Sequence, residues 1–264
     1  MFENIILGIV QGIFEWLPVS SEGIIVLVEK NFFNKEAGLE EIIRYALFLH
    51  LGTFFAVLVY FYKDILDLIK TFFNFKTSNC ENREILKFLI ITSLISGFFG
   101  FILIKIFAEM ESQLNVSTKI ITLIIGLLLL ITGILQIRAK KIENREVKRI
   151  KNGDSILLGF VQAFAALPGL SRSGLTVSIL LLRKFNSAFA LKLSFLMSLP
   201  IVLGGNIILN FNNFIFSWEL LLGLFFSFIF GLLTIKLLLK TAEKINFGWF
   251  VLLFGFFVFA SVLF

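Results

Sequence analysis

Long apolar runs separated by short polar connections dominate this chain. Six of them are about as long as the roughly 20 residues that a helix needs to cross a hydrocarbon core of about 30 Å. We therefore predict six transmembrane helices, at Ile42–Tyr62, Ile85–Phe107, Thr118–Ile137, Ser187–Leu209, Trp218–Leu239 and Phe247–Phe264.

Two further apolar runs, Asn4–Val28 and Ser155–Leu182, are interrupted near their middle. The first contains LPVSSEG and the second LPGLSRSG, so each combines a proline, which removes a backbone hydrogen bond, with serines that compete for backbone groups. A straight helix through the second run would also leave Arg172 near the bilayer centre, at a cost of roughly 3 kcal/mol. We predict that both runs are re-entrant helical hairpins, whose irregular backbone is buried against protein or lines a wet cavity.

The distribution of positive charge supports this topology. If both hairpins re-enter, 16 Lys and Arg residues lie in connections on one side of the membrane and 4 on the other. If both runs spanned the bilayer, the split would be 12 against 8. Because cytoplasmic loops are enriched in Lys and Arg, the re-entrant arrangement is favoured, and it places both termini outside the cytoplasm.

Composition agrees with a multi-pass membrane protein. Of 264 residues 58% are hydrophobic and 16% charged, a balance that excludes an ordinary soluble domain and a disordered chain. The net charge of +6 indicates loops facing an anionic cytoplasmic leaflet, so we expect the bilayer and no nucleic acid as a partner. One cysteine excludes an intramolecular disulfide, and one histidine argues against zinc or haem.

The two interrupted runs resemble each other. Leu7–Gly23 aligns with Leu158–Gly174 at an offset of 151 residues, with LG-x-V-Q at one end and S-x-x-G at the other. Each is followed by three predicted spans, and an odd number of crossings inverts the second half. We therefore expect one all-α integral membrane domain over 1–264, built from two inverted-topology repeats at about 1–138 and 152–264. In such folds the broken elements of the two halves form the site near the midplane.

The paired loops carry the groups of a phosphate site. Gln11 and Glu15 lie one helical turn apart and so share a helix face. Half-helix N-termini after each loop favour an anion, and the guanidinium of Arg172 suits phosphate. Glu15 could hold a divalent cation or act as a general base, while Ser21 could attack phosphorus. The other candidate residues are Ser20, Glu22, Gly23, Gly169, Ser171, Ser173, Gly174 and Thr176.

Less specific interpretations remain open for several of these residues. Serines in membrane helices often bond the preceding turn, which is the simpler reading for Ser20, Ser173 or Thr176 taken alone. Glu15 and Arg172 could form a structural ion pair between the hairpins. His50, the single histidine, is either a proton shuttle or a hydrogen-bonded structural residue.

At these motifs the sequence resembles the undecaprenyl-diphosphate phosphatases of the BacA/UppP type. QGIFEWLPVSSEG is similar to that family's acidic and P-V-S-S-x-G-H region, and PGLSRSG matches its P-G-x-S-R-S-G motif. LFLHLGTFFAVL and LSFLMSLPIVLGG are similar to later segments, so the resemblance covers most of the chain. It implies a hydrolase of the cell membrane that converts a C55 isoprenyl diphosphate to the monophosphate carrier of cell-envelope synthesis. It also implies a divalent cation, Mg²⁺ or Ca²⁺, and a pocket that opens away from the cytoplasm.

By position, the resemblance makes Gln11 and Glu15 the acidic-motif pair and Ser21 the nucleophile or a phosphate ligand. Ser171, Arg172 and Ser173 become the phosphate-binding turn. The chain departs from the pattern at Ile24, where the family usually has histidine, and at Gln11, which replaces a carboxylate. Either Glu15 or Glu22 then serves as the base, or His50 reaches the pocket from the next helix, or catalysis is weak.

Two functions follow from these observations. The first is hydrolysis of a polyprenyl diphosphate, with Glu15, Ser21 and Arg172 as catalytic residues. The alternative is a transporter or flippase that recognises a phosphorylated lipid or another anion without cleaving it, as the inverted repeat suggests. A monomer and a homodimer both remain open.

Overall fold

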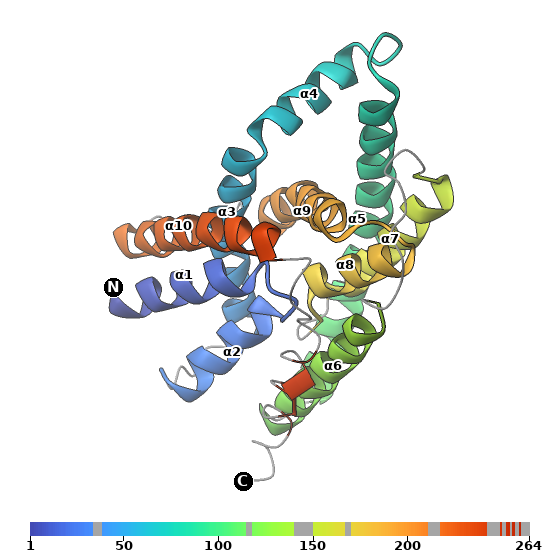
Figure 1. The fold of residues 1–264 in the computed structure, drawn as a ribbon. Helices are drawn as coiled ribbons and strands as arrows, with labels where there is room; N and C mark the ends of the chain where they lie inside the picture. The colour runs from blue at the N-terminus through green and yellow to red at the C-terminus, as the bar shows by residue number, and fades with distance from the viewer. Residues whose placement is uncertain are drawn as a thin grey trace.

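The computed structural model describes residues 1–33, 39–114, 118–139, 150–166, 170–210 and 217–241, together with 249, 252, 253, 255, 256 and 259. All regular secondary structure in these residues is helical (Figure 1). This confirms the predicted all-α class.

Five helices form the first half of the described chain: α1 (Phe2–Phe14), α2 (Ser21–Asn31), α3 (Leu39–Tyr60), α4 (Tyr62–Phe73) and α5 (Cys80–Leu114). The other five are α6 (Thr118–Ala139), α7 (Asn152–Phe164), α8 (Arg172–Leu182), α9 (Ser187–Asn210) and α10 (Trp218–Thr241).

Long apolar helices confirm that the protein crosses a membrane several times. Among the described residues, Cys80–Ile106, Ser187–Ile208 and Trp218–Thr241 are long and apolar enough to span. The pair Arg44–Tyr60 and Tyr62–Phe73 passes the same test together but bends by 82° at Phe61, so the first predicted span continues into a tilted helix, α4. The span predicted at Thr118–Ile137 is helical as α6, and the one at Phe247–Phe264 lies largely outside the described residues.

Both predicted interruptions are present as breaks between short helices. α1 ends at Phe14 and α2 begins at Ser21, while α7 ends at Phe164 and α8 begins at Arg172. The helices resume earlier than the motifs suggest, because Ser20 and Ser171 act as N-caps and the rest of SSEG and SRSG forms the first helical turn. A helix N-terminus therefore lies at each break.

Small residues on α10 hold α1 and α3 close together. A methyl group added to Gly8 of α1 would overlap Gly223 O, and one added to Gly12 would lie 2.7 Å from Ser227 O. A methyl group added to Gly52 of α3 would lie 2.7 Å from Cβ of the same Ser227. Such contacts are possible only without side chains, as is usual where membrane helices pack closely. α10 thereby sets the relative position of two helices that carry candidate site residues.

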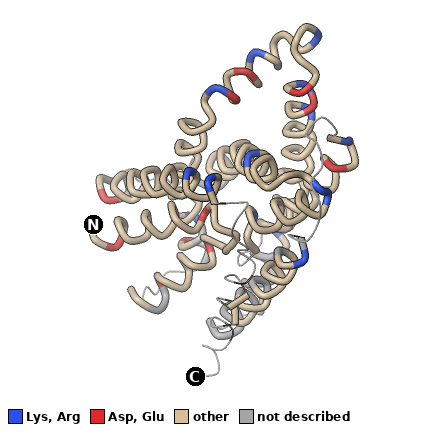
Figure 2. The backbone as a smooth tube through the Cα atoms, viewed as in Figure 1, with Lys and Arg blue, Asp and Glu red and all other residues tan. Residues whose placement is uncertain are grey.

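The helices of the two halves make corresponding contacts. α1 packs along α10, and α7 packs along α5, as Figure 1 shows. In the same way, α2 contacts α3 while α8 contacts α9, and α3 contacts α9 across the centre. Figure 2 shows both signs of charge along α4 and the start of α5, whereas α10 carries charge only toward its ends.

Candidate active site

Glu15 lies at the centre of the candidate site, where α1 ends. Its backbone N–H donates to Gln11 O at 3.0 Å, which extends the helix by one residue and directs the side chain into the protein. The residue is only 5% exposed. A buried carboxylate is stable only when charged or hydrogen-bonding partners surround it, and Glu15 has several.

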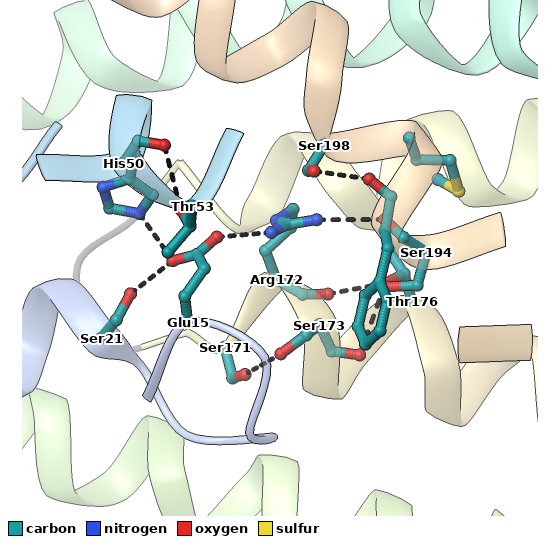
Figure 3. Close-up of polar contacts among 12 residues, drawn as sticks. Glu15, Ser21, His50, Thr53, Ser171, Arg172, Ser173, Thr176, Ser194 and Ser198 are labelled. Atoms are coloured by element: carbon teal, nitrogen blue, oxygen red, sulfur yellow. Dashed lines mark hydrogen bonds and ion pairs between the residues drawn. The ribbon is translucent and has the colours of Figure 1, made fainter. Parts of the chain in front are cut away.

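Four side chains donate to the Glu15 carboxylate. Gln11 Nε2, Ser21 Oγ and His50 Nε2 all approach Oε2, at 2.9, 2.8 and 2.9 Å. Arg172 Nη2 approaches Oε1 at 2.5 Å. These donors come from α1, α2, α3 and α8, and Figure 3 shows Glu15 between His50 and Arg172. The two interrupted segments therefore meet at Glu15 and Arg172.

The donors fix the charges of this cluster. Because four donors, one of them a guanidinium, point at the carboxyl of Glu15, it is ionised. His50 Nδ1 lies 2.7 Å from Ala46 O, which can only accept a hydrogen bond, and Nε2 faces the carboxylate. Both ring nitrogens must then carry hydrogen, so the imidazole is cationic. Glu15 is held between two positive charges, and the structural ion pair left open by the sequence is present.

Arg172 is held in place on its other sides as well. Its Nη1 donates to Ser194 O of α9 at 3.1 Å, and its guanidinium carbon lies 5.6 Å from the ring centroid of Trp16. Trp16 packs in turn on Phe195, with ring centroids 4.7 Å apart. The Trp16 ring is buried, and its Nε1 has no hydrogen-bond partner. A planar guanidinium on an aromatic face is a preorganised anion-binding group.

The serines and Thr176 divide into capping and bridging groups. Ser20 Oγ accepts from Gly23 N at 3.1 Å, and Ser171 Oγ accepts from Gly174 N at 3.0 Å. Ser173 Oγ donates to Leu17 O in the first break, at 2.8 Å, and lies 3.2 Å from Ser171 Oγ. Thr176 Oγ1 bonds Arg172 O and lies 2.7 Å from Ser194 Oγ. Ser173 thus links the two hairpins a second time, beside the Glu15–Arg172 pair.

The other predicted residues lie around this cluster. Glu22, half-buried in the first turn of α2, interacts electrostatically with His50, Glu15 and Arg172. Gly23 and Gly174 serve as the N–H donors of the two caps. Gly169 lies outside the described residues.

Sequence reasoning missed Trp16 and Ser194 as site residues. Trp16 follows Glu15 directly, and this position beside the buried carboxylate is the signal that the sequence offered; its contact with Arg172 depends on how the two breaks pack. Ser194 contributes through its backbone carbonyl, and its hydroxyl meets Thr176, a contact that only the packing of α8 on α9 reveals. Polar residues in an apolar span, such as Ser194 and Ser198 in LSFLMSL, are the one signal available beforehand.

Two side chains at the end of α1, Gln11 and Glu15, carry oxygen atoms of the kind that divalent cations bind. Gln11 Oε1 is buried with no hydrogen-bond partner among the described residues, and Gln11 lies one helical turn from Glu15. Mg²⁺ and Ca²⁺ take amide and carboxylate oxygens, and Mg²⁺ often uses one or two carboxylates plus substrate phosphates. Within the described part of the chain no group of three or more His, Cys, Asp and Glu forms a complete metal site. Glu15 and Gln11 would therefore supply only part of a cation's ligands.

Residues 4–258 match the family model of the bacitracin resistance protein BacA. The chain belongs to the BacA family. A relative from Methanococcoides burtonii, named undecaprenyl-diphosphatase, is 41% identical and covers 96% of this chain and 95% of its own. Proteins of the same name from Methanothrix thermoacetophila and Methanococcus vannielii are 33% and 34% identical, over 96% and 99% of this chain and 93% and 98% of their own.

Ile24 stands at the position where the resemblance to this family predicts a histidine. This side chain is 6% exposed and packs with Val19 and Ile25 in an apolar cluster, so it brings no polar group to Glu15. The imidazole that reaches Glu15 comes instead from His50 on α3. The sequence left open whether His50 reaches the pocket from the next helix, and the structure shows His50 in contact with Glu15.

Proposed function

We propose that this protein is a membrane phosphatase that hydrolyses undecaprenyl diphosphate, or a closely related polyprenyl diphosphate, to the monophosphate and inorganic phosphate. The observation that carries the proposal is the convergence of Arg172 and Ser21 on one buried carboxylate, Glu15. The names of the relatives support hydrolysis and do not favour transport. All three residues come from one chain, so the site needs no second subunit.

Arg172 and the helix N-termini would bind the diphosphate. Arg172 has two of its nitrogens in hydrogen bonds, and a phosphate oxygen can take the place of either acceptor. α2 and α8 both begin at the breaks beside Glu15, where backbone N–H groups and the helix dipoles favour negative charge. The isoprenyl tail would lie among the apolar helices. A divalent cation held by Glu15, Gln11 and the diphosphate would neutralise phosphate charge when bound.

Glu15 would act as the base. Ser21 Oγ already donates to Glu15 Oε2, so the carboxylate can take that proton as Oγ attacks the terminal phosphorus. The new bond joins Oγ to phosphorus, and the bond from phosphorus to the bridging oxygen breaks, which releases the lipid monophosphate with the electron pair. Water then cleaves the phosphoserine, gives inorganic phosphate, and returns the proton to Ser21. A water held in the same place as Oγ could use the same base directly.

Phosphate release from undecaprenyl diphosphate tests the proposal. Wild-type protein in detergent with Mg²⁺ should release phosphate, and Glu15→Gln and Arg172→Ala should each lower kcat/KM by about 100-fold or more. Ser93→Ala is a matched control, because the Ser93 hydroxyl donates to Leu89 O within its own helix, α5. No release by the wild type, or wild-type rates in both variants, would refute the function. Substrate labelled in its terminal phosphate distinguishes the two routes, since only attack by Ser21 leaves label on the protein.

We further propose that the fold is an inverted repeat with two re-entrant hairpins. In its support, contacts are exchanged between halves: α1 with α10 corresponds to α7 with α5, and α2 with α3 corresponds to α8 with α9. The single cysteine, Cys80, is exposed and lies in a connection assigned to the cytoplasm. An impermeant thiol reagent should label it from the cytoplasmic side only, and a cysteine placed at Phe2 in a Cys80→Ser chain from the opposite side only.

A further inference from the structure

We propose that His50 is a positioning residue that orients the Glu15 carboxylate toward Ser21. This inference rests on the proposed function, since it concerns the base of that reaction. His50 contacts Glu15 on the same oxygen, Oε2, that accepts from Ser21. Figure 3 shows the imidazole and the Ser21 hydroxyl both directed at Glu15.

The orientation of the His50 ring is fixed from behind. Nδ1 donates to Ala46 O, one turn earlier on α3, at 2.7 Å. This bond leaves Nε2 as the only ring nitrogen that can face the site, and Nε2 lies 2.9 Å from Glu15 Oε2. A histidine whose second nitrogen donates to a carbonyl keeps its ring direction, as do supporting histidines in other sites.

The helical turn that carries His50 is itself held by two other helices. Asn206 Nδ2 of α9 donates to Leu47 O at 2.8 Å, and Ser227 Oγ of α10 donates to Leu49 O at 2.8 Å. Both acceptors are backbone carbonyls of the helical turn before His50, three residues and one residue from it. The ring is thus fixed relative to α1, because α1 packs on the same face of α10 through Gly12.

Removing the imidazole would leave the carboxylate less well oriented. Arg172 holds Oε1, and without His50 the remaining donors to Oε2 are Gln11 Nε2 and the reacting Ser21 Oγ. Gln11 lies on the same helix as Glu15, so its long side chain alone cannot fix the direction of the Glu15 carboxylate relative to Ser21 on α2. A base that turns away from Oγ slows the chemical step and leaves diphosphate binding by Arg172 intact. The effect should therefore fall on kcat and not on KM.

Three variants of α3 test this assignment with undecaprenyl diphosphate as substrate. His50→Leu should lower kcat by about 10- to 100-fold, the range typical of supporting residues, with KM unchanged within about threefold. His50→Gln keeps an amide donor on that side of Glu15 and should recover part of the loss. Thr53→Val is the control, because Thr53 bonds only His50 O and should leave kcat unchanged. A His50→Leu protein with wild-type kcat, or with its whole defect in KM, would overturn the inference.

A spectroscopic test does not depend on activity. His50 is the only histidine of the chain, so ¹⁵N-histidine labelling gives one ring spectrum. We expect both ring nitrogens of the wild type to be protonated at neutral pH, and Glu15→Gln to change the Nε2 signal more than the Nδ1 signal. Equal spectra would show that the contact with Glu15 is absent. If wild-type protein releases no phosphate while the Nε2 signal responds to Glu15→Gln, the function fails and the contact stands.

Discussion

Ser20 and Ser171 cap α2 and α8 in the same way although 151 residues separate them. Ser20 has φ −71° and ψ 105°, Ser171 has φ −73° and ψ 113°, and each accepts the N–H of the glycine three residues later. The residues that follow each cap, Ser21 and Arg172, are the ones that reach Glu15. The same serine N-cap therefore sets the direction of both Ser21 and Arg172.

Removing either cap should cost similar stability. Ser20→Ala and Ser171→Ala each lose one side-chain acceptor at a helix N-terminus, worth about 1 kcal/mol. Because the caps belong to different hairpins, the double variant should lose about the sum of the two effects. Thermal unfolding in detergent measures both. If one single variant is as stable as the wild type, the two caps are not equivalent.

Arg172→Lys should behave as a severe substitution although it keeps the charge. The guanidinium donates in two directions at once, to Glu15 Oε1 and to Ser194 O, and lies over the Trp16 ring. A lysine ammonium has no planar fork and cannot maintain this arrangement. We expect kcat/KM for phosphate release to fall about 100-fold or more. The neighbouring Ser173→Ala separates this loss from general disturbance of the turn. It removes the bond to Leu17 O and the contact with Ser171 Oγ but leaves the guanidinium in place, so it should have the smaller effect.

Close packing of α1 on α10 should make Gly8→Ala strongly destabilising. The new methyl group would overlap the backbone oxygen of Gly223, and backbone cannot move aside as a side chain can. Gly204→Ala on α9 is the matched control, because a Cβ there meets nothing within 4 Å and alanine favours a helix by about 0.5–1 kcal/mol. Size-exclusion profiles after heating should show early loss of the Gly8 variant and no loss of the Gly204 variant. Equal behaviour would contradict the packing.

Asp154 should be the most important acidic residue for the stability of the second hairpin. Its side chain is fully buried, accepts from Arg183 Nε at 2.6 Å, and caps the start of α7 by accepting from Lys151 N at 2.9 Å. Asp154→Ala leaves Arg183 and the helix end without this partner. Because the Arg183 side chain is 42% exposed, the loss should be about 1.5–3 kcal/mol, the value of a hydrogen bond to a charged group. Asp67→Ala removes an exposed pair with Lys70 and should cost at most about 1 kcal/mol. Unfolding midpoints of the two variants compare them directly.

The apolar pattern was sufficient for much of the fold because lipid requires every backbone group to be bonded within a helix. It located the helices α5, α9 and α10 and both breaks, since Pro18 and the serine clusters are local signals. It did not reveal the 82° bend between α3 and α4. No proline or glycine marks Phe61, so this bend depends on tertiary packing.

The candidate site was predictable in its charges and less so in its contacts. A glutamate and an arginine in two related breaks are expected to meet, because unpaired charges at that depth are costly. Whether His50 would reach Glu15 depended on how closely α3 and α1 approach α10, and only the glycine contacts at Gly12 and Gly52 determine that distance. The role of Ser194 depends on a backbone carbonyl, which no residue pattern encodes.

The 157 residues between Glu15 and Arg172 have a consequence for biogenesis. A chain still being inserted into the membrane carries Glu15, Ser21 and His50 in its first half, but the arginine that completes the cluster follows only after four more helices. Enzymatic competence should therefore appear late, when the second hairpin docks on the first, and not gradually during synthesis. A truncated or stalled chain would contain Glu15 and Ser21 but not Arg172, whose positive charge attracts a diphosphate. Such a chain would release no phosphate from the cell's lipid carrier.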